Sequence, residues 1–479
     1  MNKEFESTIG LEIHVQLNTR SKIFSAAATE FGAEPNTQAC AVDLGLPGVL
    51  PVLNERAVEM AIMFGLAVNA KIKNNSVFAR KNYFYPDLPK GYQISQYEIP
   101  IVLGGSVEIE TEEVKKIIRI TRAHLEEDAG KSIHDLFPDE SAIDLNRAGT
   151  PLIEIVSEPD MVSAKEAVSY LKTIHSLVRY LEISDGNMQE GSFRCDANIS
   201  LKEKGSTELG TRTEIKNLNS FKFVEQAINY EIRRQGKLLL NNKKVVQETR
   251  LYDPQKNETR PMRSKEEAND YRYFPDPDLL PVEITEMTLT KIRENMPELP
   301  NERKSRFANQ YKLSEYDIGI LTSDKSLSIF FETILKVKNI DPKFSANWII
   351  TELLALANKH SVLPQDIRIT PEDFADLLVS IKNSEISSKQ GKSVLEKMWE
   401  TGDNPTSIIK SEGLSQISDE DELNKLVDNV LKNHYKSVEE YKNGKEKLFG
   451  FFVGAVMQNS KGKANPQIVS RILKVKLKK

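Results

Sequence analysis

The residues that could carry chemistry stand on short segments in which polar and apolar residues alternate. In residues 8–17 the apolar side chains take one parity, and Glu12 and His14 take the other. A period of two places these two side chains next to each other on one face of a strand. A second alternating segment carries Arg194 and Asp196 in its polar parity. Carboxylate and imidazole groups on a sheet, with a cationic neighbour, favour a site for a cation and phosphate groups.

Two further segments add carboxylates. Glu154 is the one charge in an otherwise apolar strand, and a buried charge must be paired or bind a metal. Glu126, Glu127 and Asp128 are three consecutive carboxylates at the end of another strand. Each polar face alone is more often simply solvated. Together with two arginines, Arg147 and Arg194, the segments predict an oxygen-rich Mg²⁺ site for phosphoryl transfer, where arginine neutralises developing charge.

An aromatic and basic segment covers residues 81–93 and includes Lys81 and Tyr83. Aromatic rings with interleaved lysines suit stacking on a base or nucleotide ring, with the lysines on phosphates. A rigid loop that packs its tyrosines on the sheet is an equally strong interpretation. The same two alternatives apply to residues 270–276.

Several enzyme classes are excluded by missing motifs. Gly130-Lys131-Ser132 resembles the end of a phosphate loop, but Leu125 occupies the position of its first glycine. No G-x-S-x-G or H-E-x-x-H motif occurs. Residues 387–389 (Ser-Ser-Lys) favour a helix cap over a serine amidase. If the protein handles amide nitrogen, a partner must therefore release it. With two cysteines in the chain, any metal would be held by carboxylates and histidine.

The composition is that of a globular protein: 479 residues with a net charge of −5, long enough for about three domains. No apolar run approaches the roughly 20 residues of a membrane span, and the first residues lack a signal-peptide pattern, so we expect a cytoplasmic protein. Residues 441–479 differ from the rest. They contain ten lysines and arginines against one glutamate, a local charge of +9 that predicts contact with a polyanion.

The positioning elements follow from periodicity. A capping box at residues 163–166 begins a helix that extends to about residue 181, and a second helix starts at Phe221 and is predicted to end at Gly236. A cluster of prolines between residues 275 and 300 marks a domain boundary, after which the chain is helical, with a start signal at Thr370-Pro371. We therefore predict an α+β fold with domains at 1–294, 295–405 and 406–479.

Long ordered motifs give a family resemblance over nearly the whole chain. They resemble the GatB family, the B subunits of the tRNA-dependent aspartyl/glutamyl amidotransferases, and the tail resembles a YqeY-type domain with its Asn465-Pro466. The motifs are Gly10–Leu17 (GLEIHVQL), Asp43–Gly48 (DLGLPG), Arg80–Asp87 (RKNYFYPD), Glu126–Ser132 (EEDAGKS), Asp144–Glu154 (DLNRAGTPLIE), Gly191–Ser200 (GSFRCDANIS), Glu214–Ser220 (EIKNLNS) and Asp270–Asp278 (DYRYFPDPD).

The resemblance implies a glutamine-synthetase-like cradle domain of antiparallel sheets with helices, then an all-α domain and a small tRNA-binding tail. It implies a cytoplasmic heterotrimer with two partners, the amidase subunit, which releases ammonia from glutamine, and the small subunit of the same assembly. Members of the GatB family use ATP and Mg²⁺ to phosphorylate the side-chain carboxylate of Glu-tRNA(Gln) or Asp-tRNA(Asn). The ammonia then displaces the phosphate, giving Gln-tRNA(Gln) or Asn-tRNA(Asn) for translation.

The resemblance also assigns residues. It implies His14, Glu127 and Glu154 as Mg²⁺ ligands, and Glu12, Glu126 and Asp196 as supporting catalytic carboxylates. It further implies that five residues contact the nucleotide or substrate: Lys81, Tyr83, Arg147, Arg194 and Lys216. An alternative from another class is a non-catalytic, tRNA-binding scaffold protein, in which the acidic strand faces have no catalytic role. A stand-alone amide ligase that uses free ammonia is a second alternative.

Overall fold

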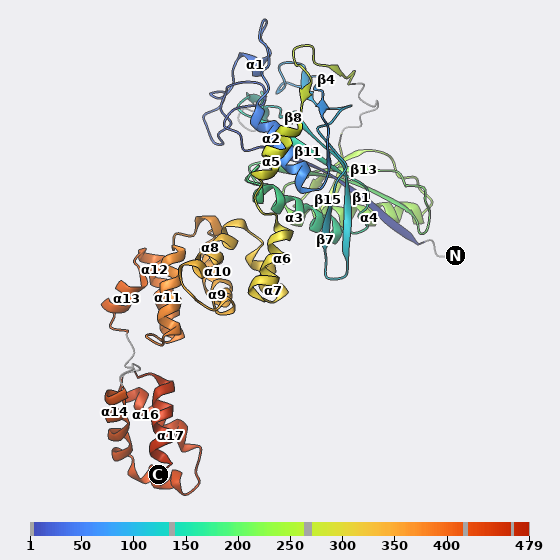
Figure 1. Cartoon of the computed structure of the whole chain (residues 1–479). Coiled ribbons are helices and arrows are strands. Elements are labelled where there is room, and N and C mark those ends of the chain that lie inside the picture. Colours follow the sequence, from blue (N-terminus) through green and yellow to red (C-terminus); the bar gives the residue numbers. More distant parts are fainter. Residues whose placement is uncertain (1–3, 134–138, 263–270, 415–419, 461–463, 479) are drawn as a thin grey trace. The chain divides into compact units, whose positions relative to one another are not determined.

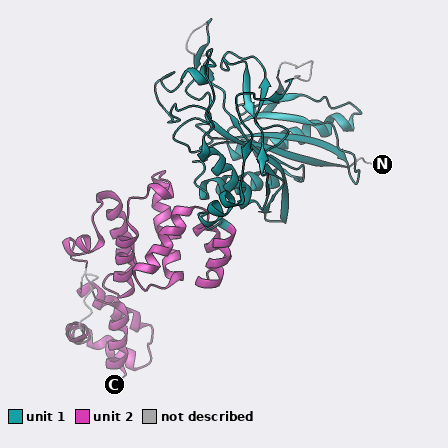
Figure 2. Ribbon diagram, turned by 45° about the horizontal axis from the view of Figure 1, so that its top comes forward, with its two compact units in different colours: residues 1–300 teal, residues 301–479 magenta. Residues whose placement is uncertain are grey.

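The chain forms two compact units, residues 1–300 and 301–479, in a computed structural model that describes residues 4–133, 139–262, 271–414, 420–460 and 464–478 (Figures 1 and 2). The predicted first boundary, at residue 294, is the last residue of helix α5 (Glu286–Glu294). Met296 and Leu299 beyond it still pack on the core of the first unit, which explains why that unit extends to residue 300.

A mixed sheet dominates the first unit. Its main path runs β15-β14-β13-β12-β1-β11-β8-β5-β4-β16, and along it only β13 and β14 are parallel. The strands of this sheet are β1 (Phe5–Gln16), β2 (Lys71–Ile72), β4 (Ala79–Asn82), β5 (Tyr92–Ser95), β6 (Val102–Leu103), β7 (Ser106–Glu110), β8 (Lys115–Glu127), β11 (Pro151–Ser157), β12 (Phe193–Glu203), β13 (Thr213–Leu218), β14 (Thr249–Asp253), β15 (Glu258–Pro261) and β16 (Phe274–Pro275). Two small sheets pair β9 (Lys131–Ile133) with β10 (Ala142–Asp144) and β3 (Asn75–Ser76) with β17 (Val282–Glu283).

Helices cover the apolar side of this sheet. The helices of the first unit are α1 (Ala41–Leu44), α2 (Glu55–Ala67), α3 (Ala164–Tyr180), α4 (Phe221–Leu240) and α5. The apolar parity of β1, from Ile9 to Val15, is at most 1 % exposed and joins α2, α3 and α4 in one core. The opposite parity, with Glu12 and His14, therefore lies on the other face of the strand. Together with the helical second unit, this confirms the α+β fold class.

The two predicted helices form, with one difference. Ser163 caps α3 by accepting a hydrogen bond from the Glu166 amide at 3.2 Å, as predicted. Helix α4, however, continues through Gly236 to Leu240. A glycine inside a helix costs only about 1 kcal/mol. The preceding Gln235 is fully buried and donates to the Ile199 carbonyl at 3.1 Å, which holds this part of α4 on the sheet.

The second unit is helical and contains two hydrophobic clusters, one within residues 307–409 and one within 423–477. Ile408 and Ile409 belong to the first cluster, so α13 packs with the middle helices, although the predicted division at 405 places it in the tail. Thr370 and Ser387 cap their helices as predicted. The elements are α6 (Pro300–Tyr311), α7 (Glu315–Leu321), α8 (Lys325–Val337), α9 (Pro342–Trp348), a π-helical turn (Ile349–Leu353), α10 (Leu354–Lys359), a 3₁₀ turn (Pro364–Asp366), α11 (Pro371–Lys382), α12 (Ser388–Thr401), α13 (Pro405–Ser411), α14 (Glu420–Asn433), α15 (Tyr435–Lys442), α16 (Leu448–Asn459) and α17 (Pro466–Leu477).

No helix in the described ranges has both the length and the apolar character needed to cross a membrane.

Candidate functional site

The site is a row of side chains across four neighbouring strands. In the antiparallel register, His14 on β1 is opposite both Arg194 on β12 and Glu154 on β11, and Glu154 is opposite His124 on β8. Residues directly opposite each other on antiparallel strands have Cβ atoms about 5 Å apart. Strands that lie far apart in the sequence therefore bring these four groups together.

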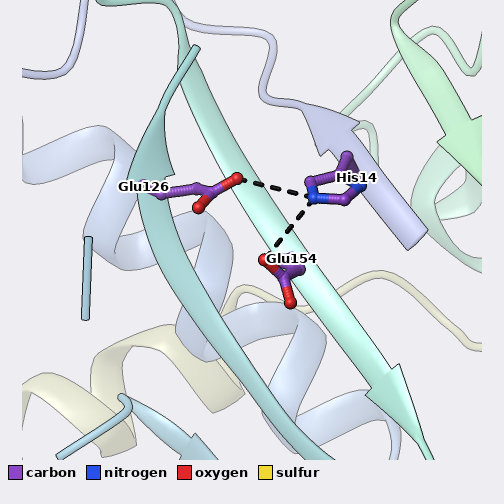
Figure 3. Close-up of side chains that lie close together, drawn as sticks. All are labelled: His14, Glu126 and Glu154. Atoms are coloured by element: carbon purple, nitrogen blue, oxygen red, sulfur yellow. Dashed lines mark ion pairs between the residues drawn. The ribbon is translucent and has the colours of Figure 1, made fainter. Parts of the chain in front are cut away.

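His14, Glu126 and Glu154 form the centre of the site (Figure 3). The Nε2 atom of His14 lies 3.5 Å from Glu154 Oε2 and 3.7 Å from Glu126 Oε1. One ligand atom from each residue lies within 4.8 Å of the others, and among the described residues this is the one group of histidine, cysteine and acidic side chains with that property. The three side chains converge from β1, β8 and β11 on a common point, as a cation site requires.

The charges at this centre are strongly coupled. Burial lowers the pKa of His14, but hydrogen bonding and charge from Glu154, with the charge of Glu126, outweigh burial and raise that pKa to about 9. Burial and the charge of Glu154 raise the pKa of Glu126 to about 7. Burial acts in the same direction on Glu154, but the two histidines lower its pKa below the usual range. The centre thus has one strongly acidic carboxyl, that of Glu154, and one with a pKa near neutral pH, that of Glu126.

His124 belongs to the site but is absent from the predicted site residues. Its Nε2 atom lies 3.5 Å from Glu154 Oε2 and 3.9 Å from Glu126 Oε2, and the residue is 4 % exposed. Burial lowers the pKa of His124 to about 4, so the imidazole is neutral at neutral pH. His124 and Glu126 are two residues apart on one strand and so share a face, and this alternation was the signal in the sequence that could have placed His124 at the site.

Glu127, the predicted third ligand, lies elsewhere. Its side chain is buried and pairs with the Lys90 ammonium, and its Oε1 accepts the Ile94 amide at 2.8 Å. Consecutive residues on a strand point to opposite faces, so Glu126 and Glu127 cannot both face His14. Glu126, which the resemblance implies as a supporting carboxylate, is the residue whose side chain lies close to His14 and Glu154.

Glu12, Asp196 and Lys216 form a second polar group on the same face. Glu12 is opposite Asp196 in the register and accepts a hydrogen bond from Asn198 at 2.9 Å. Burial raises the pKa of Glu12, and the nearby charges of Glu154, Glu214 and Asp196 add to this. Lys216 Nζ lies 2.7 Å from Asp196 and 3.1 Å from Glu214. Burial lowers the pKa of Lys216, but these two carboxylates outweigh it and raise it, so the lysine is an internal ion-pair partner.

The two predicted arginines meet at Asp128. Arg194 Nη2 donates to Asp128 Oδ2 at 2.8 Å, and Arg147 Nε lies 3.6 Å from the same oxygen. Arg147 also donates to the carbonyls of Ala129 and Gly130 at 2.9 and 2.6 Å. Both arginine side chains remain about one-third exposed, at 35 % and 34 %. The pair thus presents fixed positive charge beside the His14 row.

Lys81 and Tyr83 lie among aromatic rings. Lys81 Nζ is 4.9 Å from the centre of the Tyr271 ring and 5.8 Å from that of Tyr83, while Tyr97 and Tyr273 stack with centroids 4.0 Å apart. Burial raises the pKa of the Tyr83 hydroxyl, which donates to Gln93 at 3.2 Å. The segments predicted at 81–93 and 271–276 are therefore adjacent. Asp270 lies outside the described residues.

The basic segment divides into paired and unpaired cations. Lys445, Arg471 and Lys476 make ion pairs with acidic residues of α14 and α15. Four exposed lysines are without an ion-pair partner in the described part of the chain: Lys442, Lys447, Lys474 and Lys478. Lys461, Lys463 and Lys479 lie outside that part.

Comparison with known proteins covers nearly all of the chain. A family model described as the GatB/GatE catalytic domain matches residues 7–290, and a second, described as a GatB domain, matches residues 329–477. Proteins named as the B subunits of aspartyl/glutamyl-tRNA(Asn/Gln) amidotransferase from Alkalilimnicola ehrlichii and Nitrosococcus oceani are each 58 % identical to this chain over 475 residues. These matches span 99 % of this chain and 99 % and 100 % of the two relatives. A protein of the same name from Coxiella burnetii is 58 % identical over 476 residues, 99 % of this chain and 100 % of its own length.

Proposed function

The chain belongs to the GatB family of amidotransferase subunits, and from this premise we propose that it phosphorylates the side-chain carboxylate of a misacylated tRNA and then carries out its amidation. The substrates would be Glu-tRNA(Gln), Asp-tRNA(Asn) or both, in a cytoplasmic heterotrimer with the amidase subunit, which supplies ammonia, and the small subunit. The observation that carries this proposal is the convergence of His14, Glu126 and Glu154 beside two arginines.

The donor set fits a hard divalent cation. Mg²⁺ takes one or two carboxylates and keeps several positions for water and phosphate oxygens. Glu126 and Glu154 supply two carboxylates, and His14 adds one imidazole nitrogen. Burial and then repulsion from Glu154 raise the pKa of Glu126, so a cation would stabilise both groups as carboxylates. When bound, Mg²⁺ would neutralise nucleotide phosphate charge.

The chain's own residues divide the remaining work. Arg147 and Arg194 would bind the phosphates and neutralise charge during transfer. Lys81 and the tyrosines around it would hold the nucleotide. The amino acid carboxylate and ammonia would meet next to Glu12 and Asp196. Lys216 would be held there by its ion pairs with two carboxylates. Glu127 would support the site indirectly from the other face of β8, through its ion pair with Lys90 and the hydrogen bond that it accepts from the Ile94 amide of β5.

The chemistry explains why ATP is needed. Direct amidation of a carboxylate would have to expel an oxide. A carboxylate oxygen that attacks the terminal phosphorus of ATP gives an acyl phosphate and ADP; ammonia then adds to the acyl carbon and phosphate leaves, with the amide as product. The described residues contain no nucleophile motif for hydrolysing glutamine, which supports supply of ammonia by the amidase.

The test is ADP formation by the purified heterotrimer with Mg²⁺, with and without Glu-tRNA(Gln), for the wild type and Glu154→Gln. We expect charged tRNA to stimulate ADP formation and the substitution to reduce it at least about a hundredfold, the scale of losing a group that stabilises transition-state charge. Binding of charged tRNA should change less than about threefold.

Glu158→Gln is the matched control. Glu158 directly follows the same strand, and its Oε1 atom accepts a hydrogen bond of 2.8 Å from Thr121 Oγ1, outside the site. ADP formation by the Glu154→Gln heterotrimer equal to that of the control would overturn the kinase assignment. If tRNA binding persists without any ATP cleavage by the wild type, the scaffold alternative takes its place.

A further inference from the structure

Asp128 is a buried carboxylate directly after β8, and the proposed function gives it no role of its own. It is 4 % exposed, and its Oδ2 atom accepts from Arg194 Nη2 at 2.8 Å and from Gln16 Nε2 at 2.9 Å. Arg147 Nε lies 3.6 Å from the same oxygen. One carboxylate oxygen therefore faces donors from three different parts of the chain.

The backbone of Asp128 is fixed as firmly as its side chain. Its amide donates to the Thr150 carbonyl at 2.9 Å, and its carbonyl accepts the Gly149 amide at 2.9 Å. The same turn carries Arg147, whose guanidinium bonds the two carbonyls that follow Asp128. Arg147 and Asp128 are thus tied to each other twice, through the main chain and through the side chains.

The charge arithmetic favours an anionic ligand at this point. Two guanidinium groups share one carboxylate, which leaves one excess positive charge among these three groups, and both arginine side chains are about one-third exposed. A guanidinium has five donors in a fixed plane, and a carboxylate that takes one edge determines where the other edge points. Arg194 is opposite His14 in the register, so this arginine belongs to the strand position next to the candidate cation site.

We propose that Asp128 is a positioning residue that orients Arg194 and Arg147 to bind the phosphate groups of ATP. This inference rests on the proposed function. Asp128 acts only through the two arginines and does not itself touch the nucleotide, because like charge would repel it.

The sign of the effect on ATP affinity tests the proposal. Asp128→Asn removes a negative charge beside a polyanion, and charge alone predicts tighter ATP binding. Loss of orientation predicts weaker binding, by about tenfold for one charge-assisted hydrogen bond. The measurement is the dissociation constant of ATP with Mg²⁺, by equilibrium dialysis on the heterotrimer without tRNA.

Asp160→Asn is the matched control. Asp160 accepts two hydrogen bonds from the Arg119 guanidinium, at 2.6 and 2.9 Å, and one from its amide, at 3.1 Å, on an exposed part of the same unit. The loss of this carboxylate should leave ATP affinity within about twofold of the wild type. Arg194→Lys keeps the charge but loses the planar fork, so it should also weaken ATP binding. In the Arg194→Lys background, Asp128→Asn should have less effect than in the wild type.

Unchanged or tighter binding in Asp128→Asn overturns the inference and leaves the proposed function intact. Equal loss from Asp128→Asn in both backgrounds overturns it too, since a residue that acts through Arg194 cannot be independent of it. If Asp128→Asn does not fold, wild-type affinity in Arg194→Lys is the overturning result. A wild-type heterotrimer that binds no ATP refutes the proposed function as well.

Discussion

Gly149→Ala should destabilise the first unit by roughly 2–5 kcal/mol. Gly149 has φ = +81°, in the left-handed region, where an L-residue costs about 1–2 kcal/mol. A Cβ atom there would lie 2.7 Å from Asp43 Oδ1 and 3.3 Å from Lys22 Cδ. Overpacking of this kind typically adds about 1–3 kcal/mol.

The neighbours of Gly149 cannot move away without loss. The Lys22 side chain is fully buried, its Nζ lies 3.3 Å from Asp43 Oδ2, and Asp43 also accepts from Ser25 and from the Cys40 amide. Moving either member breaks a buried ion pair and leaves a charge without its partner. The clash therefore remains in the substituted protein.

The assay can separate the two units. Both tryptophans, Trp348 and Trp399, lie in residues 301–479, so tryptophan fluorescence during urea unfolding reports on the second unit. Circular dichroism reports on both units. Gly149→Ala should shift a circular dichroism transition and leave the tryptophan transition in place.

Gly32→Ala is the control, because Gly32 has φ = +84° and no atom lies within 4 Å of the position that an alanine Cβ would take there. It shares the conformational cost and lacks the clash. If Gly149→Ala costs no more than Gly32→Ala, the argument from the buried ion pair is refuted.

Three more outcomes are expected. Burial raises the pKa of Glu231, but hydrogen bonds from Arg234 and Gln235 outweigh it and lower the pKa below its usual 4.5; the stabilisation is therefore present above pH 4.5 and lost as the pH falls through the lowered value. Glu231→Gln should cost roughly 3–5 kcal/mol at pH 7 and flatten the acid limb of the urea stability profile; an unchanged limb would contradict this. Glu126→Gln should weaken Mn²⁺ binding, measured by electron paramagnetic resonance, at least about tenfold and Glu127→Gln less, and the reverse order would return the ligand role to Glu127. Changing the four exposed, unpaired tail lysines to glutamine should lower the salt slope of tRNA binding by up to about 3, whereas four lysines changed in the first unit should not; equal slopes would refute the electrostatic role of the tail.

Local patterns predicted the faces of the strands well. The alternation in residues 8–17 placed Glu12 and His14 on the polar face because their neighbours of the other parity are buried in the core. The start of α3 at Ser163 was equally readable, since a cap depends on four consecutive residues. These features are encoded within a few residues of the chain.

Features that depend on pairing between distant strands were harder to predict. The neighbourhood of His124 and Glu154 follows from the register of β8 and β11, which no local pattern specifies. The choice between Glu126 and Glu127, by contrast, follows from the alternation within β8, where Ala123 and Leu125 of the other parity are buried in the core. The ion pair between Lys216 and Asp196 was equally hard to predict, because β12 and β13 become neighbours only in the folded sheet.

The position of β1 at the centre of the sheet has a consequence for biosynthesis. This strand precedes every other strand of the described sheet in the sequence, yet its partners on β11 and β12 follow about 140 to 200 residues later. At about 5–20 residues per second, the ribosome needs roughly 7–40 s to supply them. Throughout that interval, a strand with one apolar face lacks its sheet partners β11 and β12, so we expect the growing chain to be most open to pairing with other chains before His14 meets Glu154.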